Sequence, residues 1–407
     1  MDFRYSEEQL ALQETLQRFI VRDYDFERRR ALARSPLGFS AEAWERYAEF
    51  GLLALPFPEK FGGLGGTGVD VLTVMEQVGR GLLLEPFATS VVICGGLIRD
   101  VASDAVCESI LPQIAAGKVR VALAAHEAAG RYELRHVATS ATRGGGSTGS
   151  TGASRSTGAS RSASASGSGS GSGWRLNGAK SVVLDAPSAD YFLVSARAAG
   201  AVADADGISL YLVPRAAPGL TLSGYPTQSG GRAADLRLED VTVGDDALIG
   251  APERALGSIE KAVDAGIAAL CGEALGIVTA LNEATLNYLK TRKQFGTPIG
   301  AFQALQHRMA EMYIAGEQIR SMAIIAAIHG DSPDAAARRR AVSGAKAYIG
   351  QAARFVGQQA VQLHGAMGLV DDLPVGHYFK RLTMIDLTFG DADFHLARFS
   401  DSGDVTV

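Results

Sequence analysis

The spacing of apolar residues predicts helical segments near both ends of the chain and a strand-like segment between them. Near the N-terminus, Leu12, Leu16 and Phe19 follow one another at intervals of four and three residues, which indicates the buried face of a helix. Ser6 stands three residues before a glutamine, the pattern of a capping box at a helix start. A second helix is predicted to begin near Ser40.

Apolar positions at helical spacing return from about residue 258 and continue almost to the end. They run through residues 270–288, 302–322 and 341–363, and long helices with short connections predict a bundle. Ser332 followed by Pro333 is expected to begin one of these helices, with the serine as N-cap and the proline at the first helical position.

The middle of the chain has the sequence pattern of β strands. Short apolar runs at residues 119–123, 174–193, 208–213 and 236–243 are separated by turn residues, which predicts a small antiparallel β domain. The predicted fold is therefore mainly α with an inserted β domain. We expect an N-terminal α-helical domain at 1–118, a β-barrel-like middle domain at 119–243 and a C-terminal four-helix bundle at 244–407.

One stretch inside the predicted β domain cannot belong to a packed core. Residues 144–173 are almost entirely Gly, Ser, Thr and Ala, and Ser-Thr-Gly-Ala-Ser-Arg occurs twice in tandem from Ser150. Such a segment buries too little apolar surface to offset the entropy of ordering it. We interpret it as a disordered hairpin loop, and a tether or partner site is the alternative.

Composition narrows the classes of function. A net charge of -5 offers no concentrated basic patch of the kind that nucleic-acid binders carry. The three cysteines are scattered and the seven histidines show no ligand spacing, so we expect buried reduced thiols and no metal site. No uncharged apolar run approaches the ~18 residues of a membrane span. The charged N-terminal helix argues against a secretory signal, and we expect a cytoplasmic protein.

The most informative motif joins two predicted C-terminal helices. From Arg292 to Gln303 the chain reads Arg-Lys-Gln-Phe-Gly-Thr-Pro-Ile-Gly-Ala-Phe-Gln, so a helix ends in a basic pair, turns, and a new helix begins. A guanidinium beside a helix terminus suits a diphosphate. Basic residues at helix ends also compensate the helix dipole, so the spacing alone leaves both interpretations open.

As a whole string, this motif resembles the flavin-diphosphate segment of the acyl-CoA dehydrogenases, R-x-x-F-G-x-x-I-x-x-F-Q. The resemblance extends over nearly the whole chain. Further matching segments are 51–53 with 58–63 (G-L-L…P-E-x-x-G-G), 177–180 (N-G-x-K), 239–241 (E-D-V) and 362–368 (Q-x-x-G-G-x-G). Within the family, residues 376–382 and 389–393 look closest to the small subunit of pimeloyl-CoA dehydrogenase.

The resemblance implies a tetramer that holds FAD, acts on an acyl-CoA and passes electrons to an acceptor flavoprotein. In such enzymes a carboxylate removes the α proton of the thioester while the β hydrogen leaves as hydride to the flavin. The positions that match the family's flavin contacts are Arg292, Gln294, Phe295, Gln303, Gln362, Gly365, Asp391 and Asp393.

The sequence departs from the family where the carboxylate is needed. The two positions at which relatives carry this glutamate hold Gly266 and Phe389. Asp264 is the nearest acid on the same predicted helix and becomes our candidate base, with Asp391 next. Because residues two apart on a helix point about 200° away from one another, Asp264 would need a local backbone adjustment to replace residue 266.

The expected flavin contacts also differ in part. Residues 182–184 read Val-Val-Leu where the family has a tryptophan and a hydroxyl, and His126 replaces the usual threonine. Ala366 stands where the family has a second glycine in the adenylate loop.

Two functions therefore remain open. The chain is either a FAD-dependent acyl-CoA dehydrogenase with an unusual base, or a catalytically silent subunit. The silent subunit would lend Arg292, Gln303 and Gln362 to a FAD held mainly by a related large subunit. These readings correspond to a homo-tetramer and a hetero-tetramer.

Overall fold

The computed structural model describes residues 5–144 and 173–402. The chain forms N-terminal helices, then one β sheet, then a group of long helices, which confirms the predicted fold class. Of the Gly/Ser-rich stretch 144–173, only the two end residues are described; the rest of the predicted loop lies outside the described residues.

Six α helices and one wider, π-type helix make up the N-terminal part. Their bounds are α1 Glu7–Asp23, α2 Phe26–Arg34, α3 Ala41–Glu49, α4 Gly68–Gly81, η3 Phe87–Gly95 (the π-type helix), α5 Gly96–Val101 and α6 Asp104–Ala115. Ser6 forms the predicted capping box at the start of α1, and the Ser40 hydroxyl caps α3. Both predicted helix starts are confirmed.

Eight strands of the described residues form one sheet. They are β1 Val121–Ala124, β2 Ser140–Arg143, β3 Gly173–Leu184, β4 Tyr191–Arg197, β5 Ile208–Pro214, β6 Leu220–Pro226, β7 Arg232–Gly244 and β8 Leu248–Ile249. Hydrogen bonds connect them in the order β6-β7-β3-β2-β4-β5-β8, and β1 pairs with β4. The β1–β4 pair is parallel, as is the short contact between β2 and β4, so the expectation of an antiparallel domain was wrong for these two pairs, whereas the other strand pairs of this sheet are antiparallel. The strands of the two parallel pairs are distant in sequence, and the local spacing of apolar residues does not determine whether such strands run parallel or antiparallel.

The C-terminal part consists of α7 Leu256–Thr291, α8 Gln303–His329, α9 Ala335–His364, α10 Pro374–Leu387 and α11 Ala392–Asp401. The short strands β9 Lys293–Gln294 and β10 Thr297–Pro298 form the hairpin between α7 and α8. At the start of α9, Asp334 rather than Ser332 is the N-cap, because its carboxylate accepts from the amides of Ala336 and Ala337. The predicted serine cap was two residues too early.

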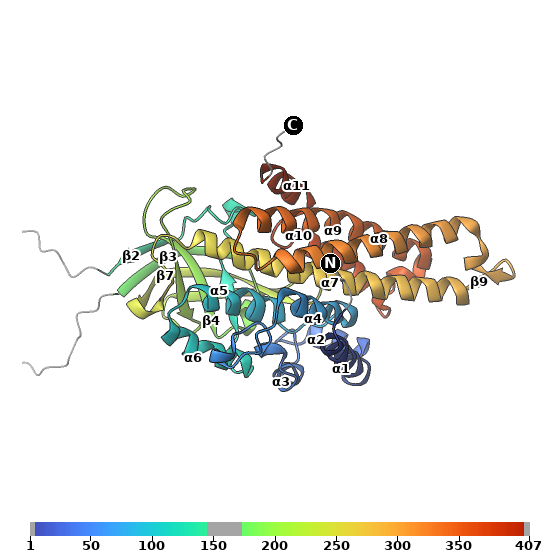
Figure 1. Ribbon diagram of the computed structural model, residues 1–407, viewed down its shortest axis with the longest axis horizontal. Helices are drawn as coiled ribbons and strands as arrows, with labels where there is room; N and C mark the ends of the chain where they lie inside the picture. Colours follow the sequence, from blue (N-terminus) through green and yellow to red (C-terminus); the bar gives the residue numbers. More distant parts are fainter. Residues whose placement is uncertain (1–4, 145–172, 403–407) are drawn as a thin grey trace, which may run out of the picture.

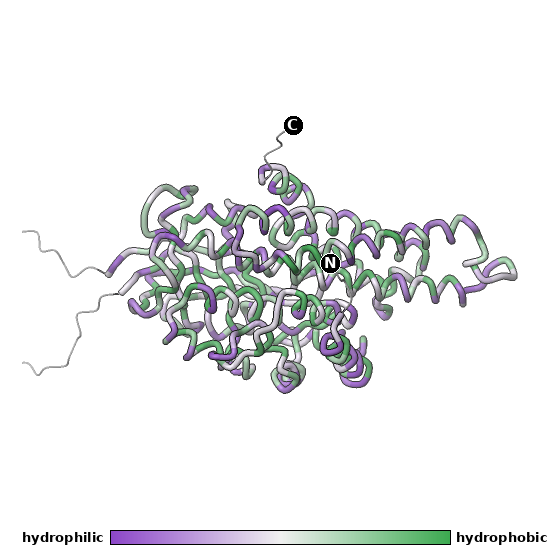
Figure 2. The backbone as a smooth tube through the Cα atoms, viewed as in Figure 1, coloured by the Kyte–Doolittle hydropathy of each residue, from purple (hydrophilic) through white to green (hydrophobic). Residues whose placement is uncertain are grey.

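These groups are arranged along an elongated molecule (Figure 1). The sheet lies at one end, α7, α8 and α9 extend to the other, and α1 to α6 cover one side. Apolar residues concentrate where α4 and α7 meet inside the molecule, whereas the outer turns of α1 are mostly polar (Figure 2). Helix α7 is long and apolar enough to cross a membrane by length and composition only, and 89% of its most apolar window is buried in the protein, as expected of a core helix.

Helices α4 and α7 approach each other closely because glycines face the contact. A Cβ atom at Gly276 would lie 1.8 Å from the carbonyl oxygen of Glu76, and one at Gly79 would lie 2.0 Å from that of Glu273. No larger side chain fits either position without separating the helices. This contact joins the N-terminal helices and the C-terminal helices into a shared core.

Candidate active site

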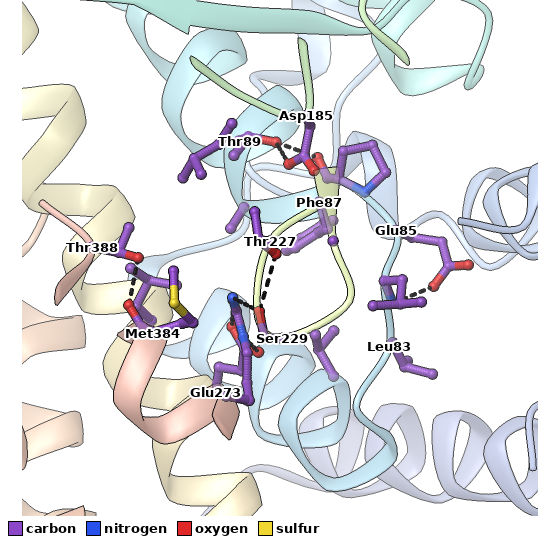
Figure 3. A pocket seen from close by; sticks show the side chains of 18 of the residues that line it. Leu83, Glu85, Phe87, Thr89, Asp185, Thr227, Ser229, Glu273, Met384 and Thr388 are labelled. Carbon is purple, nitrogen blue, oxygen red and sulfur yellow. Dashed lines mark hydrogen bonds and ion pairs between the residues drawn. The ribbon is translucent and has the colours of Figure 1, made fainter. Parts of the chain in front are cut away.

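A cavity lies where the N-terminal helices, the β domain and the C-terminal helices meet (Figure 3). We call it the central cavity. Its walls come from η3, α7, α10, the segment after α10 and two loops of the β domain; they include Phe87, Thr89, Ile93, Asp185, Ser229, Gly266, Leu270, Glu273, Arg381, Met384, Thr388 and Phe389. Gly266 and Phe389, the two positions matched to the glutamate of the resembled family, both line this cavity.

Apolar side chains fill the space where a carboxylate at either position would lie. A Cβ atom at Gly266 would stand 2.5 Å from Cδ1 of Ile93 and 2.6 Å from its Cγ1, so a longer side chain would displace that isoleucine. The Phe389 ring stacks on the His126 ring, with centroids 5.8 Å apart and planes 29° apart. Burial lowers the pKa of His126 to about 4, so this imidazole is neutral near pH 7.

The structure places Asp264 away from the central cavity. Its carboxylate is buried and accepts from Arg338 Nε at 3.1 Å and from Arg398 Nη1 at 2.7 Å and Nη2 at 3.2 Å. It lines a second cavity, between the β domain and α11, whose walls also include His126, Tyr132, Phe389, Phe394 and His395. The geometry argues against Asp264 as the base, because two guanidinium groups hold its carboxylate at the second cavity, on another side of α7.

Polar residues that sequence spacing did not single out gather in the central cavity. Arg381 donates to Glu273 through Nε at 2.5 Å and Nη2 at 2.7 Å, a two-point ion pair in a buried wall. Glu273 interrupts an apolar stretch of α7, and Arg381 belongs to the 376–382 motif. The sequence shows each residue as unusual in its surroundings, but only the fold shows that the two form an ion pair.

A buried arginine borders the same cavity. Arg29 is 2% exposed, and its guanidinium donates to the carbonyl oxygens of Leu82 and Ser229. Burial lowers its pKa. Arg29 thereby ties the first helices to a loop of the β domain that forms one wall.

Two acids that line the central cavity, Glu85 and Asp185, have raised pKa values. Burial raises the pKa of Glu85 to about 7 and that of Asp185 to about 6. The amides of Ser40 and Leu84 donate to the Glu85 carboxylate, and the Thr89 hydroxyl donates to Asp185 Oδ2 at 2.6 Å (Figure 3). These hydrogen bonds favour the charged forms and offset part of the effect of burial.

Glu85→Gln should flatten the dependence of stability on pH. Because the folded pKa of Glu85 is raised from 4.5 to about 7, the stability contributed by its proton is fully present below pH 4.5 and is lost as pH rises through 7. The loss is about 3 kcal/mol for a shift of this size, and Asp185 adds a slope of the same sign. Urea unfolding at several pH values tests this, and an unchanged slope in the variant would contradict it.

The residues matched to flavin contacts lie in three places: the α7–α8 hairpin, the end of α9 and the start of α11. Arg292, Gln294 and Phe295 lie exposed at the tip of the α7–α8 hairpin, and Gln303 begins α8 beside them. Gln362 and Gly365 are exposed at the end of α9, where the His364 ring stacks on that of Tyr288 from α7 at a centroid distance of 4.4 Å.

Asp391 and Asp393 lie elsewhere, at the start of α11. The Asp391 carboxylate caps this helix by accepting from the amide of Phe394 at 2.9 Å. This structural role does not depend on a contact with flavin. Within residues 5–144 and 173–402, no three His, Cys, Asp or Glu side chains come together as metal ligands would. All three cysteines are free and buried.

Three family models match the chain in order along its length. They are the acyl-CoA dehydrogenase N-terminal domain at residues 6–118, middle domain at 146–241 and C-terminal domain at 256–402.

The chain belongs to the acyl-CoA dehydrogenase family.

Curated relatives and solved structures agree with this assignment. The probable acyl-CoA dehydrogenase YngJ of Bacillus subtilis (strain 168) is 26% identical over 360 residues, which cover 87% of each chain. The short-chain specific acyl-CoA dehydrogenase of Homo sapiens mitochondria is 26% identical over 364 residues, 87% of this chain and 80% of that protein. The structure of a variant of the Tcur3481-Tcur3483 steroid ACAD matches 97% of both chains, with a TM-score of 0.81 and 27% identity. The ChsE4-ChsE5 complex from Mycobacterium tuberculosis matches in fold with a TM-score of 0.84, at 24% identity over 100% of both chains.

Acyl-CoA dehydrogenases are FAD-dependent oxidoreductases that act on CH–CH bonds. The hairpin tip of this chain fits one part of such a dinucleotide, because it offers the exposed Arg292 guanidinium and a Phe295 ring that is 92% exposed. The β domain fits FAD less well than the hairpin tip does. Val182 there has a φ of 53° and its amide donates to Asp235 Oδ1 at 2.9 Å, while the neighbouring segment lacks the family's hydroxyl.

Proposed function

We propose that this chain is the non-desaturating subunit of a heteromeric acyl-CoA dehydrogenase and contributes part of the FAD site of a partner subunit. The observation that carries the proposal is the wall of the central cavity. Both positions that need a carboxylate hold residues without one, Gly266 and Phe389, and the nearest acid on α7 is engaged by two arginines.

Removal of an α proton requires a base within hydrogen-bond reach of it. Ile93 occupies the space beside Gly266, and the Phe389 ring occupies the other position. The partner subunit is therefore expected to supply the carboxylate. FAD, when bound, would supply the acceptor for the hydride, and an electron-acceptor flavoprotein would be the partner for its electrons.

The residues matched to flavin contacts in the segment 292–303 are exposed. Arg292, Phe295 and Gln303 lie at the hairpin tip, at the end of the molecule opposite the sheet (Figure 1). A cofactor seated at the chain's own β domain is out of their reach. They suit the diphosphate of a cofactor bound by another subunit, as an exposed guanidinium does.

Two similarities support a heteromeric assembly. The steroid ACAD that matches this chain is named for two proteins, Tcur3481 and Tcur3483, and another structure of the same fold is a ChsE4-ChsE5 complex. The motifs at 376–382 and 389–393 resemble the small subunit of pimeloyl-CoA dehydrogenase. We infer that the tetramer is built with a related large subunit and acts on an acyl-CoA.

The alternative is a self-sufficient dehydrogenase that uses Asp264. That carboxylate would have to leave Arg338 and Arg398, which flank it at 3.1 and 2.7 Å, and move around α7. Breaking such a buried pair costs several kcal/mol, on the order of 3–5.

A flavin count on the purified protein tests the proposal. The chain expressed alone should carry little or no FAD, whereas the complex formed by co-expression with its large subunit should be yellow. Absorbance and released FAD per chain measure this directly. Stoichiometric FAD on the chain alone, reducible by an acyl-CoA, would refute the proposal.

A further inference from the structure

Phe389 lies between the central cavity and the second cavity. Among the described residues, it is the one that lines both the central cavity and the second cavity. Gly266 and Met384 also line the central cavity, whereas Tyr132 and Phe394 line the second cavity.

Side chains from two other parts of the fold complete the wall. His126, from the segment after β1, stacks on the Phe389 ring at a centroid distance of 5.8 Å. Ile93, from η3, covers Gly266 within 2.6 Å of where its Cβ would be. These side chains are neutral, so the partition between the cavities is apolar.

Buried hydrogen bonds hold the segment that carries Phe389. Lys346 is fully buried and donates its ammonium protons to the carbonyl oxygens of Asp386 at 2.7 Å and Gly390 at 2.5 Å. His395 Nε2 lies 3.1 Å from the Phe389 carbonyl oxygen. Burial lowers the pKa of His395 to about 3, so the neutral ring donates its single proton here and accepts from Ser343 at Nδ1.

This support maintains an unfavourable backbone. Phe389 has a φ of 60°, a left-handed conformation that is uncommon for a bulky residue and persists where its surroundings impose it. Hydrogen bonds to the backbone of this segment thus hold the ring at the wall, in addition to its stack on His126.

The partition lies at residues 266 and 389, the two positions from which a base would act on the substrate. A carboxylate at residue 266 or 389 would remove a proton from the carbon next to the thioester, so the acyl chain and the CoA must extend from that point in different directions. A thioester placed for reaction would have to pass through the partition.

We infer that the Phe389–His126 stack is a plug that keeps acyl chains from crossing between the two cavities, so that this subunit does not bind an acyl thioester in a reactive position. The inference rests on the proposed function and extends it: the subunit has lost the passage for the substrate as well as the base.

Binding measurements on the full chain test the plug. Isothermal titration with CoA, butyryl-CoA and octanoyl-CoA should give the wild-type chain no gain in affinity with acyl length. Phe389→Gly removes the ring and suits the positive φ, and it should bind octanoyl-CoA at least tenfold more tightly than butyryl-CoA. Each methylene that enters an apolar cavity contributes up to about fourfold.

Phe394→Ala is the matched control, because Phe394 is an aromatic residue that lines the second cavity alone. It should leave the dependence on acyl length as in the wild type. The plug is excluded if the unmodified chain already gains affinity with acyl length, a measurement that needs no variant. It is also excluded if a folded Phe389→Gly chain shows no gain or no binding. These outcomes are separate from the flavin count, so the plug and the proposed function can fail independently.

Discussion

Asp264→Asn should lower the free energy of unfolding of this chain by about 3–5 kcal/mol and leave flavin reduction in the assembled complex unchanged. The carboxylate is 1% exposed and is the shared acceptor of Arg338 and Arg398. An asparagine keeps the shape but removes the charge, so two largely buried guanidinium groups on α9 and α11 lose their counter-ion. Chemical denaturation of the purified chain measures the loss.

Asp331→Asn is the control for this variant. Asp331 also forms ion pairs with two cations, Arg99 and Lys261, but its side chain is 50% exposed, so its loss should cost at most about 1 kcal/mol. The opposite pattern would identify Asp264 as the base after all: unchanged stability, with flavin reduction in the complex about a hundredfold slower.

Arg292→Ala should weaken FAD binding by the complex about ten- to hundredfold without unfolding the chain. A charge-assisted contact to a diphosphate contributes about 1.5–3 kcal/mol, and the exposed Arg292 side chain has no packing role to lose. Flavin occupancy of the complex under limiting FAD measures the effect.

Lys290→Ala provides the matched control for Arg292. Lys290 is an exposed cation in the last turn of α7, two residues before Arg292. Its loss changes the net charge equally but removes no contact to the cofactor. Equal losses of occupancy in both variants would show that a diffuse positive field, rather than a diphosphate contact, acts at the hairpin tip.

Local patterns predicted the elements of this fold better than their long-range contacts. Caps and apolar spacing identified the starts of α1 and α3, because a capping serine and the face that follows it are neighbours in sequence. The parallel pairing of β1 with β4 joins residues about seventy positions apart, and no spacing rule describes it. The cap of α9 was misplaced because Ser332 and Asp334 both suit the role and only the backbone decides between them.

In the candidate site, too, local patterns were predictable and long-range contacts were not. The helical repeat correctly predicted that Asp264 and Gly266 face different directions, and the structure gives them different cavities. The partners of Asp264, Arg338 and Arg398, come from two other helices and could not be foreseen. The Glu273–Arg381 pair and the Phe389–His126 stack also depend on contacts across more than a hundred residues.

Anaerobic reduction of the flavin by an acyl-CoA tests the central claim most directly. It is followed for this chain supplied with FAD, for the complex with its large subunit, and for a complex whose large subunit carries glutamine in place of its base. We predict reduction by the intact complex alone, because this chain offers no carboxylate at residue 266 or 389. Reduction by the isolated chain, or by the complex without the partner's base at the rate of the intact one, would contradict the account.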